Sequence, residues 1–213
     1  MSAINFFDTL TDLPLFKGIS HETMARTVGR YRFEFKKFVE GETIIEAGSP
    51  CASIVFVLSG KVRMKTVIAD FEIGQTLSEG SVFMADFLYG RITKFPSSVV
   101  ASETVGTLEI SKADYINILN SDNIFLLNYL NYLSRKAQLC FDNVPNGSFL
   151  SKISYLIDFF TQPSSSDIQI RTSSKIFDVL GLSETDYNLN MENLVAKKMI
   201  SSFTGNQINI KSL

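Results

Sequence analysis

The chain has 213 residues, and because a domain usually takes about 150 residues, this length predicts one or two domains. Hydrophobic residues make up 45% of the chain and charged residues 20%, an ordinary globular composition that excludes a disordered protein. The net charge of −2 weakly opposes a nucleic-acid partner, because proteins of that class usually carry a basic surplus.

The stretch from Phe33 to about Ile110 has the pattern of strands and turns. Runs of β-branched and aromatic residues, such as 43–45, 54–58 and 62–65, alternate with recurrent glycines. Short strands with turn signals about every 8–12 residues indicate an all-β sandwich or barrel. We therefore predict a β-rich N-terminal half.

The stretch 122–143 changes to a helical pattern and contains neither glycine nor proline. Its apolar residues follow a heptad spacing, at Leu126, Leu130, Leu133, Ala137, Cys140 and Val144. A heptad seam is typical of a helix that packs on a partner helix, so we predict a homodimer through this helix. The alternative is a helix that packs on its own domain.

Beyond this helix the pattern breaks at Pro145, because proline lacks the backbone N–H and disfavours helix in the preceding residue. The elements predicted next are a helix at 149–160, a strand at 168–171, helices at 173–180 and 183–199, and a β-hairpin at 200–210. Their order is that of a winged helix-turn-helix.

The cysteines Cys51 and Cys140 and the single histidine, His21, are too few for a structural zinc site or a four-cysteine iron–sulfur cluster. We expect no metal, no cofactor and no enzymatic activity, because no nucleophile–base pair or phosphate loop is found. The N-terminus lacks a signal-peptide pattern, and no apolar run approaches the ~18 residues of a membrane span. We expect a cytoplasmic protein with no membrane partner.

This order of elements, together with several short segments, resembles the Crp/Fnr superfamily of bacterial transcription regulators. The segments are LPLFKGIS (13–20), GETIIEAG (41–48), VLSGKV (57–62) and IFDVLGLS (176–183). The resemblance covers nearly the whole length and implies an α+β fold with two domains. Its parts would be a cyclic-nucleotide-binding-like β jelly roll (1–120), a dimerisation helix with a hinge (121–145), and a winged helix-turn-helix DNA-binding domain (146–213).

The effector segment departs from the family pattern. Members that bind a cyclic nucleotide carry Phe-Gly-Glu in the phosphate-binding segment and an arginine further along. Here Met84 and Ala85 stand at the glycine and glutamate positions, Phe95 stands at the arginine position, and Asp86 would repel a phosphate. We predict no response to cAMP; the site either takes an apolar ligand or is filled by its own side chains. The candidate effector-pocket residues are Phe83, Met84, Ala85, Asp86, Phe95, Ser97 and Ser98.

The second helix of the helix-turn-helix begins at Ser183, a predicted N-cap whose capping-box partner is Asp186. Apolar residues of this helix, among them Val195, are predicted to pack inward. The family's outward arginines are absent, but Asn188 suits adenine and Glu184 suits cytosine. The candidate DNA-binding residues are Ser173, Ser174, Lys175, Ser183, Glu184, Thr185, Asn188 and Lys197.

Residues 148–213 carry equal numbers of basic and acidic side chains, so non-specific DNA binding should be weak. We predict a homodimeric Crp/Fnr-type regulator that binds double-stranded DNA at a promoter or operator and is not controlled by cAMP. An unknown small-molecule effector and RNA polymerase are further candidate partners. One alternative is a protein-interaction module of the same fold that has lost DNA binding. The other is a cyclic-nucleotide-responsive transcription activator.

Overall fold

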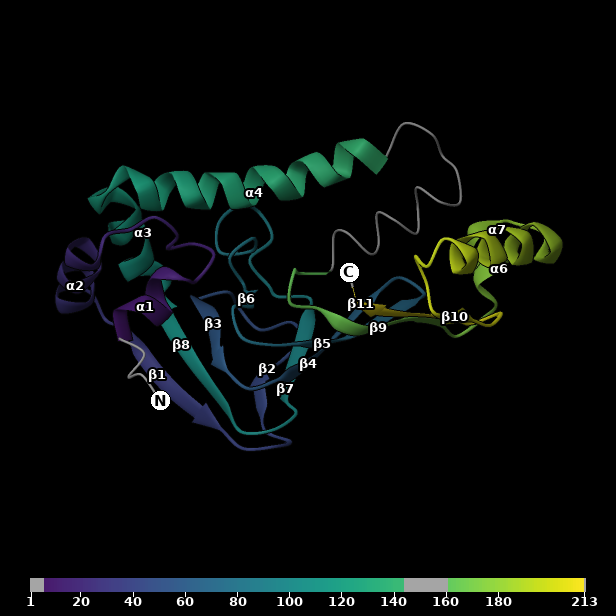
Figure 1. Ribbon diagram of the computed structural model, residues 1–213, viewed down its shortest axis with the longest axis horizontal. Coiled ribbons are helices and arrows are strands. Elements are labelled where there is room, and N and C mark those ends of the chain that lie inside the picture. The colour runs from purple at the N-terminus through teal and green to yellow at the C-terminus, as the bar shows by residue number, and fades with distance from the viewer. Residues whose placement is uncertain (1–5, 144–160, 213) are drawn as a thin grey trace.

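The computed structural model describes residues 6–143 and 161–212 of the chain (Figure 1). Two short helices, α1 (Phe6–Thr11) and α2 (His21–Arg30), precede the strands. Ser20 caps α2 by accepting a hydrogen bond from the backbone N–H of Thr23. His21 is exposed in the first turn, where its Nε2 lies 2.9 Å from a carboxylate oxygen of Asp8.

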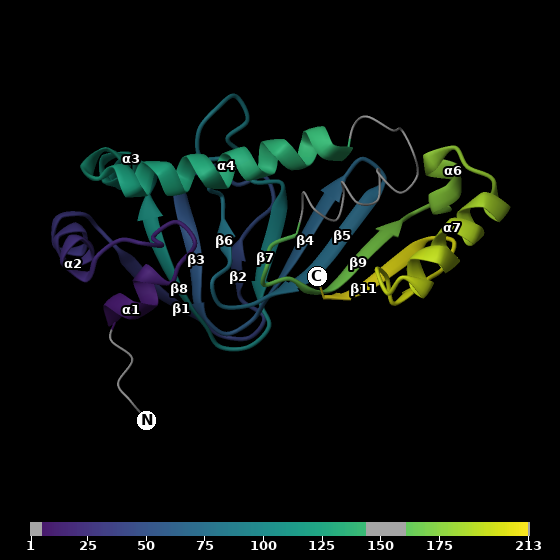
Figure 2. The same ribbon diagram turned by 45° about the horizontal axis from the view of Figure 1, so that its top comes forward.

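Eight strands follow, as the alternation of glycines and β-branched runs predicted. They are β1 (Glu34–Phe38), β2 (Thr43–Ile45), β3 (Ser53–Ser59), β4 (Val62–Ile68), β5 (Phe71–Leu77), β6 (Val82–Phe83), β7 (Ser97–Ala101) and β8 (Val105–Ser111). One sheet has four strands in the order β1-β8-β3-β6, and the other contains β5-β4-β7-β2. The two sheets form a β-sandwich (Figure 2).

The turn between β3 and β4 requires glycine. Gly60 has φ +85°, and a Cβ built on it would come within 2.4 Å of the carbonyl oxygen of Thr104. No side chain fits there without a backbone shift, which explains why a glycine stands in the segment VLSGKV.

Separate apolar cores lie on the two faces of the four-stranded sheet. Between the sheets, side chains from both meet, including Val57, Met64 and Val99. On the other face, Ile54 and Leu108 pack against the helices. The alternation of side chains along a strand is what directs neighbouring residues of β3 into different cores.

The helices α3 (Lys112–Ser121) and α4 (Asn123–Asn143) follow β8, and α4 lies along the sandwich (Figure 1). One face of α4 packs on its own domain, through the buried Phe125 and Tyr129. The residues of the predicted heptad seam are less buried than these two: Leu126 and Leu130 are 37% and 47% exposed, Ala137 is exposed, and Leu133 is half-buried. The side chain of Cys140, and Val144 altogether, lie outside the described residues. No helix among the described residues is long and apolar enough to cross a membrane.

The described chain resumes at residue 161 and builds what we call the C-terminal unit. Its elements are β9 (Ser166–Thr172), α6 (Ile176–Leu180), α7 (Glu184–Ala196), β10 (Ser202–Phe203) and β11 (Gln207–Ser212). The predicted helix at 149–160 lies outside the described residues. The predicted turn after α6 is confirmed, because Gly181 adopts a left-handed conformation at φ 67°. The predicted hairpin is also present, as β10 pairs with β11.

The C-terminal unit shares a sheet with the sandwich. Strand β9 pairs antiparallel with β5, placing Ile170 opposite Ile73, and the full order of this seven-stranded sheet is β10-β11-β9-β5-β4-β7-β2 (Figure 2). Ile73 is buried in the core of the C-terminal unit, beside Ile176 and Tyr187. The sequence led us to expect two domains joined through a helix, whereas here they are also joined through paired strands.

Candidate functional site

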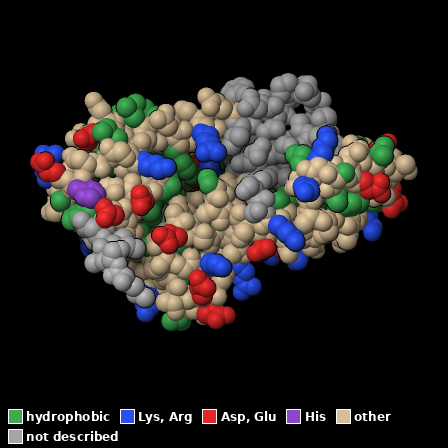
Figure 3. Space-filling model, viewed as in Figure 1, with side chains coloured by type: hydrophobic (Ala, Val, Ile, Leu, Met, Phe, Trp, Pro, Cys, Tyr) green, Lys and Arg blue, Asp and Glu red, His purple; other side chains and the backbone are tan. Residues whose placement is uncertain are grey.

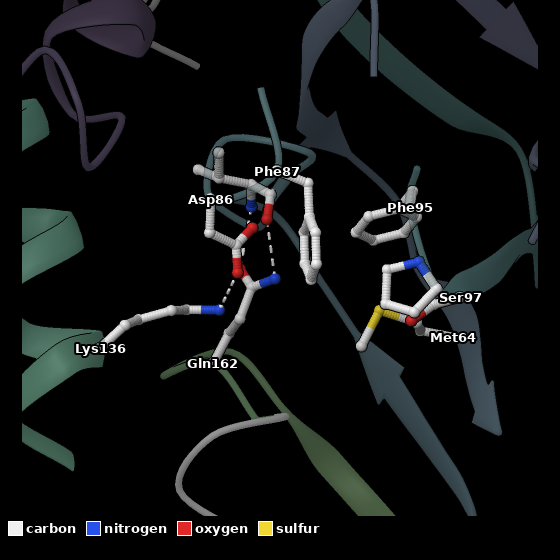
Figure 4. Close-up of a pocket in the computed structure, with 9 residues that line it drawn as sticks. Met64, Asp86, Phe87, Phe95, Ser97, Lys136 and Gln162 are labelled. Carbon is white, nitrogen blue, oxygen red and sulfur yellow. Dashed lines mark hydrogen bonds and ion pairs between the residues drawn. The ribbon is translucent and has the colours of Figure 1, made fainter. Parts of the chain in front are cut away.

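A small pocket opens at the end of the sandwich beneath α4 (Figure 4). Its lining comes from strands of both sheets, the loop after β6, helix α4 and the segment before β9: Met64, Val82, Asp86, Phe87, Phe95, Pro96, Ser97, Lys136 and Gln162. The cavity volume is about 30 Å³, on a scale where ~10–15 Å³ holds one water molecule. The pocket as it stands has room for water and not for a nucleotide.

The predicted effector residues fall into separate groups. Asp86, Phe95 and Ser97 line the pocket. Phe83 and Met84 are buried in the core between the sheets, and Ala85 is buried in the core beneath the helices, so these three fill space rather than face a cavity. Ser98 does not line this pocket, because strand alternation directs it away from Ser97.

Three phenylalanine rings pack against one another beside the pocket. The rings of Phe83 and Phe87 both meet that of Phe95 edge to face, with centroid separations of 6.3 Å and 5.9 Å. Phe95 is only 5% exposed, so the residue predicted to stand at the family's arginine position makes apolar contacts. An anion would find no cationic fork there.

Met84 keeps the backbone conformation that a glycine would favour. Its φ is +68°, a left-handed value that costs a non-glycine residue about 1–2 kcal/mol. The side chain is 6% exposed and packs in the core between the sheets. The backbone at this position therefore matches glycine, while the side chain contributes apolar packing.

Gln162 lines the pocket and bonds to the backbone of β6 with its side-chain amide. The amide oxygen accepts a hydrogen bond of 2.9 Å from the backbone N–H of Val82, and the amide nitrogen donates one of 2.8 Å to the carbonyl oxygen of Val82 (Figure 4). Next to it, the hydroxyls of Ser164 and Ser81 lie 2.7 Å apart. The segment that leads into the C-terminal unit is thus bonded to the sandwich at strand β6 and the residue before it.

Asp86 is engaged by a cation from α4. Lys136 Nζ lies 2.7 Å from Asp86 Oδ2, and both side chains are largely buried. Nearby, burial raises the pKa of Tyr129 to about 12, with the charges of Tyr89 and Asp86 adding to the effect. The phenol stays protonated and donates a hydrogen bond of 2.9 Å to the carbonyl oxygen of Ala85.

Sequence reasoning missed Gln162 and Lys136, because each is distant in the chain from the residues it meets. Gln162 stands in a polar Gln-Pro-Ser segment that has the ordinary pattern of a loop. Lys136 lies on the helix whose heptad pattern pointed to a partner chain. No local signal distinguishes either residue from a solvated one.

The helix α7 presents its predicted polar residues to solvent. Ser183 is its N-cap, and its hydroxyl accepts from the backbone N–H of Asp186 at 3.1 Å and donates to that carboxylate at 2.7 Å. The predicted DNA-binding residues are all exposed: Ser173, Ser174, Lys175, Ser183, Glu184, Thr185, Asn188 and Lys197.

The inward face of α7 is formed by Tyr187, Met191 and Leu194. Val195 is predicted wrongly, since it is 37% exposed; at 100° per residue it falls beside the buried stripe rather than on it. Leu189, at 60% exposure, lies on the solvent side.

Two features show how charge is distributed on the surface around α7. Lys175 lies across the hairpin turn, because a Cβ built on Gly205 would meet its Cδ at 2.9 Å and its Nζ at 3.0 Å. Acidic and basic side chains are mixed over this end of the molecule (Figure 3). The surface is therefore not a basic patch.

Comparison with protein families matches residues 35–122 to the family described as cyclic nucleotide-binding domain. These residues span the β-sandwich from β1 to the end of α3, so the N-terminal part has the fold of that family. A comparison with curated proteins found no match.

Two examples illustrate the likeness to solved structures. The catabolite activator protein of Thermus thermophilus aligns with a TM-score of 0.52 and 19% identity over 93% of both chains. The N-terminal domain of a transcriptional regulator from Streptomyces coelicolor A3(2) aligns with a TM-score of 0.51 and 21% identity, covering 66% of this chain and all of that one. The first alignment extends beyond the sandwich into the C-terminal part.

Proposed function

We propose that the chain is a Crp/Fnr-type transcription regulator that binds double-stranded DNA as a homodimer and does not respond to cAMP. The observation that carries the proposal is the C-terminal unit, in which α6, a left-handed glycine turn, a capped α7 and a hairpin follow one another. In a helix-turn-helix the second helix enters the major groove and its N-terminal residues contact base edges. Here those residues are Glu184, Thr185 and Asn188.

The exposed leucines of α4 support the homodimer. Leu126 and Leu130 lie on the seam that the heptad spacing predicted, and Leu127 beside them is 55% exposed. Large apolar side chains grouped on one helix face favour an interaction surface. A two-fold dimer through α4 would place two copies of α7 for two half-sites of an operator.

The insensitivity to cAMP is supported by the effector end of the barrel. The arginine position holds the buried Phe95, and Asp86 is paired with Lys136. A nucleotide phosphate would have to replace that ion pair and would meet a carboxylate. Calorimetry with cAMP and cGMP tests this point, and binding in the micromolar range would contradict it.

Selection from random duplexes at low salt tests the DNA-binding proposal. We expect one site to be enriched, with a Kd that rises less steeply with salt than for a basic domain, because few phosphates can be neutralised. The variant Asn188→Ala should weaken the selected site by about 1–3 kcal/mol and relax the preference at one base pair. Asn120→Ala, an exposed asparagine on α3, is the matched control and should change nothing.

A second candidate function is a protein-interaction module of the same fold. The observation that favours it is the outer face of α7, where the exposed Leu189 and Glu192 suit a protein surface better than a phosphate backbone. If the folded dimer enriches no duplex at low salt, DNA binding is refuted and this function takes its place.

A further inference from the structure

The strand β6 stands at the open end of the four-stranded sheet, after β3. An end strand has backbone N–H and C=O groups that face away from its neighbour and need other partners. At Val82, which is 2% exposed, those groups are satisfied by the side-chain amide of Gln162 at 2.9 Å and 2.8 Å. One primary carboxamide therefore takes the place that a neighbouring strand would have.

The pocket beside this amide has apolar walls on one side and the Asp86–Lys136 ion pair on the other (Figure 4). Met64, Phe87 and Phe95 line the same pocket, and the two rings meet edge to face (Figure 4). A paired backbone donor and acceptor beside aromatic walls is the arrangement that orients a small molecule: apolar walls supply burial, and a few polar groups fix the orientation.

The same amide belongs to the segment that leads into the C-terminal unit. Ser164 is bonded to Ser81 at 2.7 Å, and the Ser165 hydroxyl donates to Gln75 Oε1 at 2.6 Å. Strand β9 begins directly afterwards, at residue 166, and pairs with β5. The residue that bonds to the backbone of Val82 is therefore only a few residues before the strand that attaches the C-terminal unit to the sandwich.

We propose that the end of the sandwich at β6 is a binding site for primary carboxamides carried on a flat apolar group. In the absence of such a molecule the chain fills this site with its own Gln162. The carboxamide oxygen accepts from Val82 N–H and its NH₂ donates to Val82 C=O, while the ring lies against Phe87 and Phe95. A free molecule of this class competes with Gln162 and loosens the attachment of residues 162–165 to the barrel. The site is separate from the proposed DNA contacts and stands whether or not the chain binds DNA.

The experiment measures amide hydrogen exchange at Val82 in the full chain. Gln162→Ala should raise the exchange rate about tenfold or more, since both backbone partners are lost. Gln162→Glu keeps an acceptor but has no NH₂ donor, and should give an intermediate rise. Gln138→Ala, an exposed glutamine on α4, is the matched control and should leave Val82 unchanged.

Benzamide then serves as the probe ligand and benzoate as its control. In the Gln162→Ala variant, benzamide should restore the protection of Val82, whereas benzoate, which keeps an acceptor but lacks the NH₂ donor, should restore it only in part. The parent chain should bind benzamide at least tenfold more weakly, because Gln162 must be displaced. Unchanged exchange in Gln162→Ala would refute the role of Gln162. Equal effects of benzamide and benzoate, or none from either, would refute the carboxamide site.

Discussion

The backbone and the side chain of Met84 have opposite effects on stability, and the substitution Met84→Gly tests the balance between them. Glycine would relieve the left-handed backbone at φ +68°, worth about 1–2 kcal/mol, of which roughly 0.5–1 kcal/mol is lost again to the entropy of the unfolded chain. Against that gain, removing a buried methionine side chain costs about 2–5 kcal/mol. We expect a net destabilisation of about 2 kcal/mol and no gain of cAMP binding, because Phe95 remains.

The matched control is Ala69→Gly. Ala69 also has a left-handed backbone, at φ +49° in the turn between β4 and β5, but it is exposed and buries no comparable side chain. This variant should be stabilised by about 0.5 kcal/mol. Urea denaturation measures both changes in the free energy of unfolding, and equal m values show that the unfolded states are alike. If Met84→Gly is stabilised as much as Ala69→Gly, the methionine side chain does not stabilise the core between the sheets and our account of it is wrong.

Three further predictions follow from the described contacts. Burial opposes ionisation of Glu109, but hydrogen bonds, led by that from Lys36, hold its pKa below the usual value. The stabilisation from the ionised carboxylate is present above the unfolded-state pKa and is lost as the pH falls through the folded-state pKa. Glu109→Gln should therefore make the free energy of unfolding depend less steeply on pH in the acid range, and an unchanged pH dependence would refute this. Leu126→Asp with Leu130→Asp should convert a dimer to monomer in light scattering; a persistent dimer would refute the α4 seam. Burial raises the pKa of Cys51 to about 11, so peptide mapping should find it unalkylated at pH 8 until the chain unfolds.

The local patterns predicted most of the elements but not how their side chains are used. Glycine spacing located the strands, and Ser183 and Gly181 located the ends of the helices, because caps and turns depend on residues close in sequence. Phe95, which counting from the strands put among the effector residues, lines the small pocket. These features are local, and so a single sequence carries them.

The features that could not be predicted depend on pairing across long stretches of chain. Ile168 and Ile170 alternate as any half-buried strand does, and nothing in that pattern names β5 as their partner. The bonds of Gln162 to Val82 span 80 residues. Ser98 lies outside the pocket and Val195 outside the buried stripe for a smaller reason: each stands one residue from a buried neighbour, and a shift of one position moves a side chain to another face.

The shared sheet has a practical consequence for dividing the protein. A fragment ending after α4 would keep the sandwich but lose β9, leaving β5 as an uncovered edge with Ile73 turned to water. Unpaired edges of this kind recruit strands from other molecules, so such a fragment should self-associate into aggregates even though its own cores are complete. Binding studies on the isolated sensor half would need a charged residue, such as lysine at position 73, to keep that edge soluble.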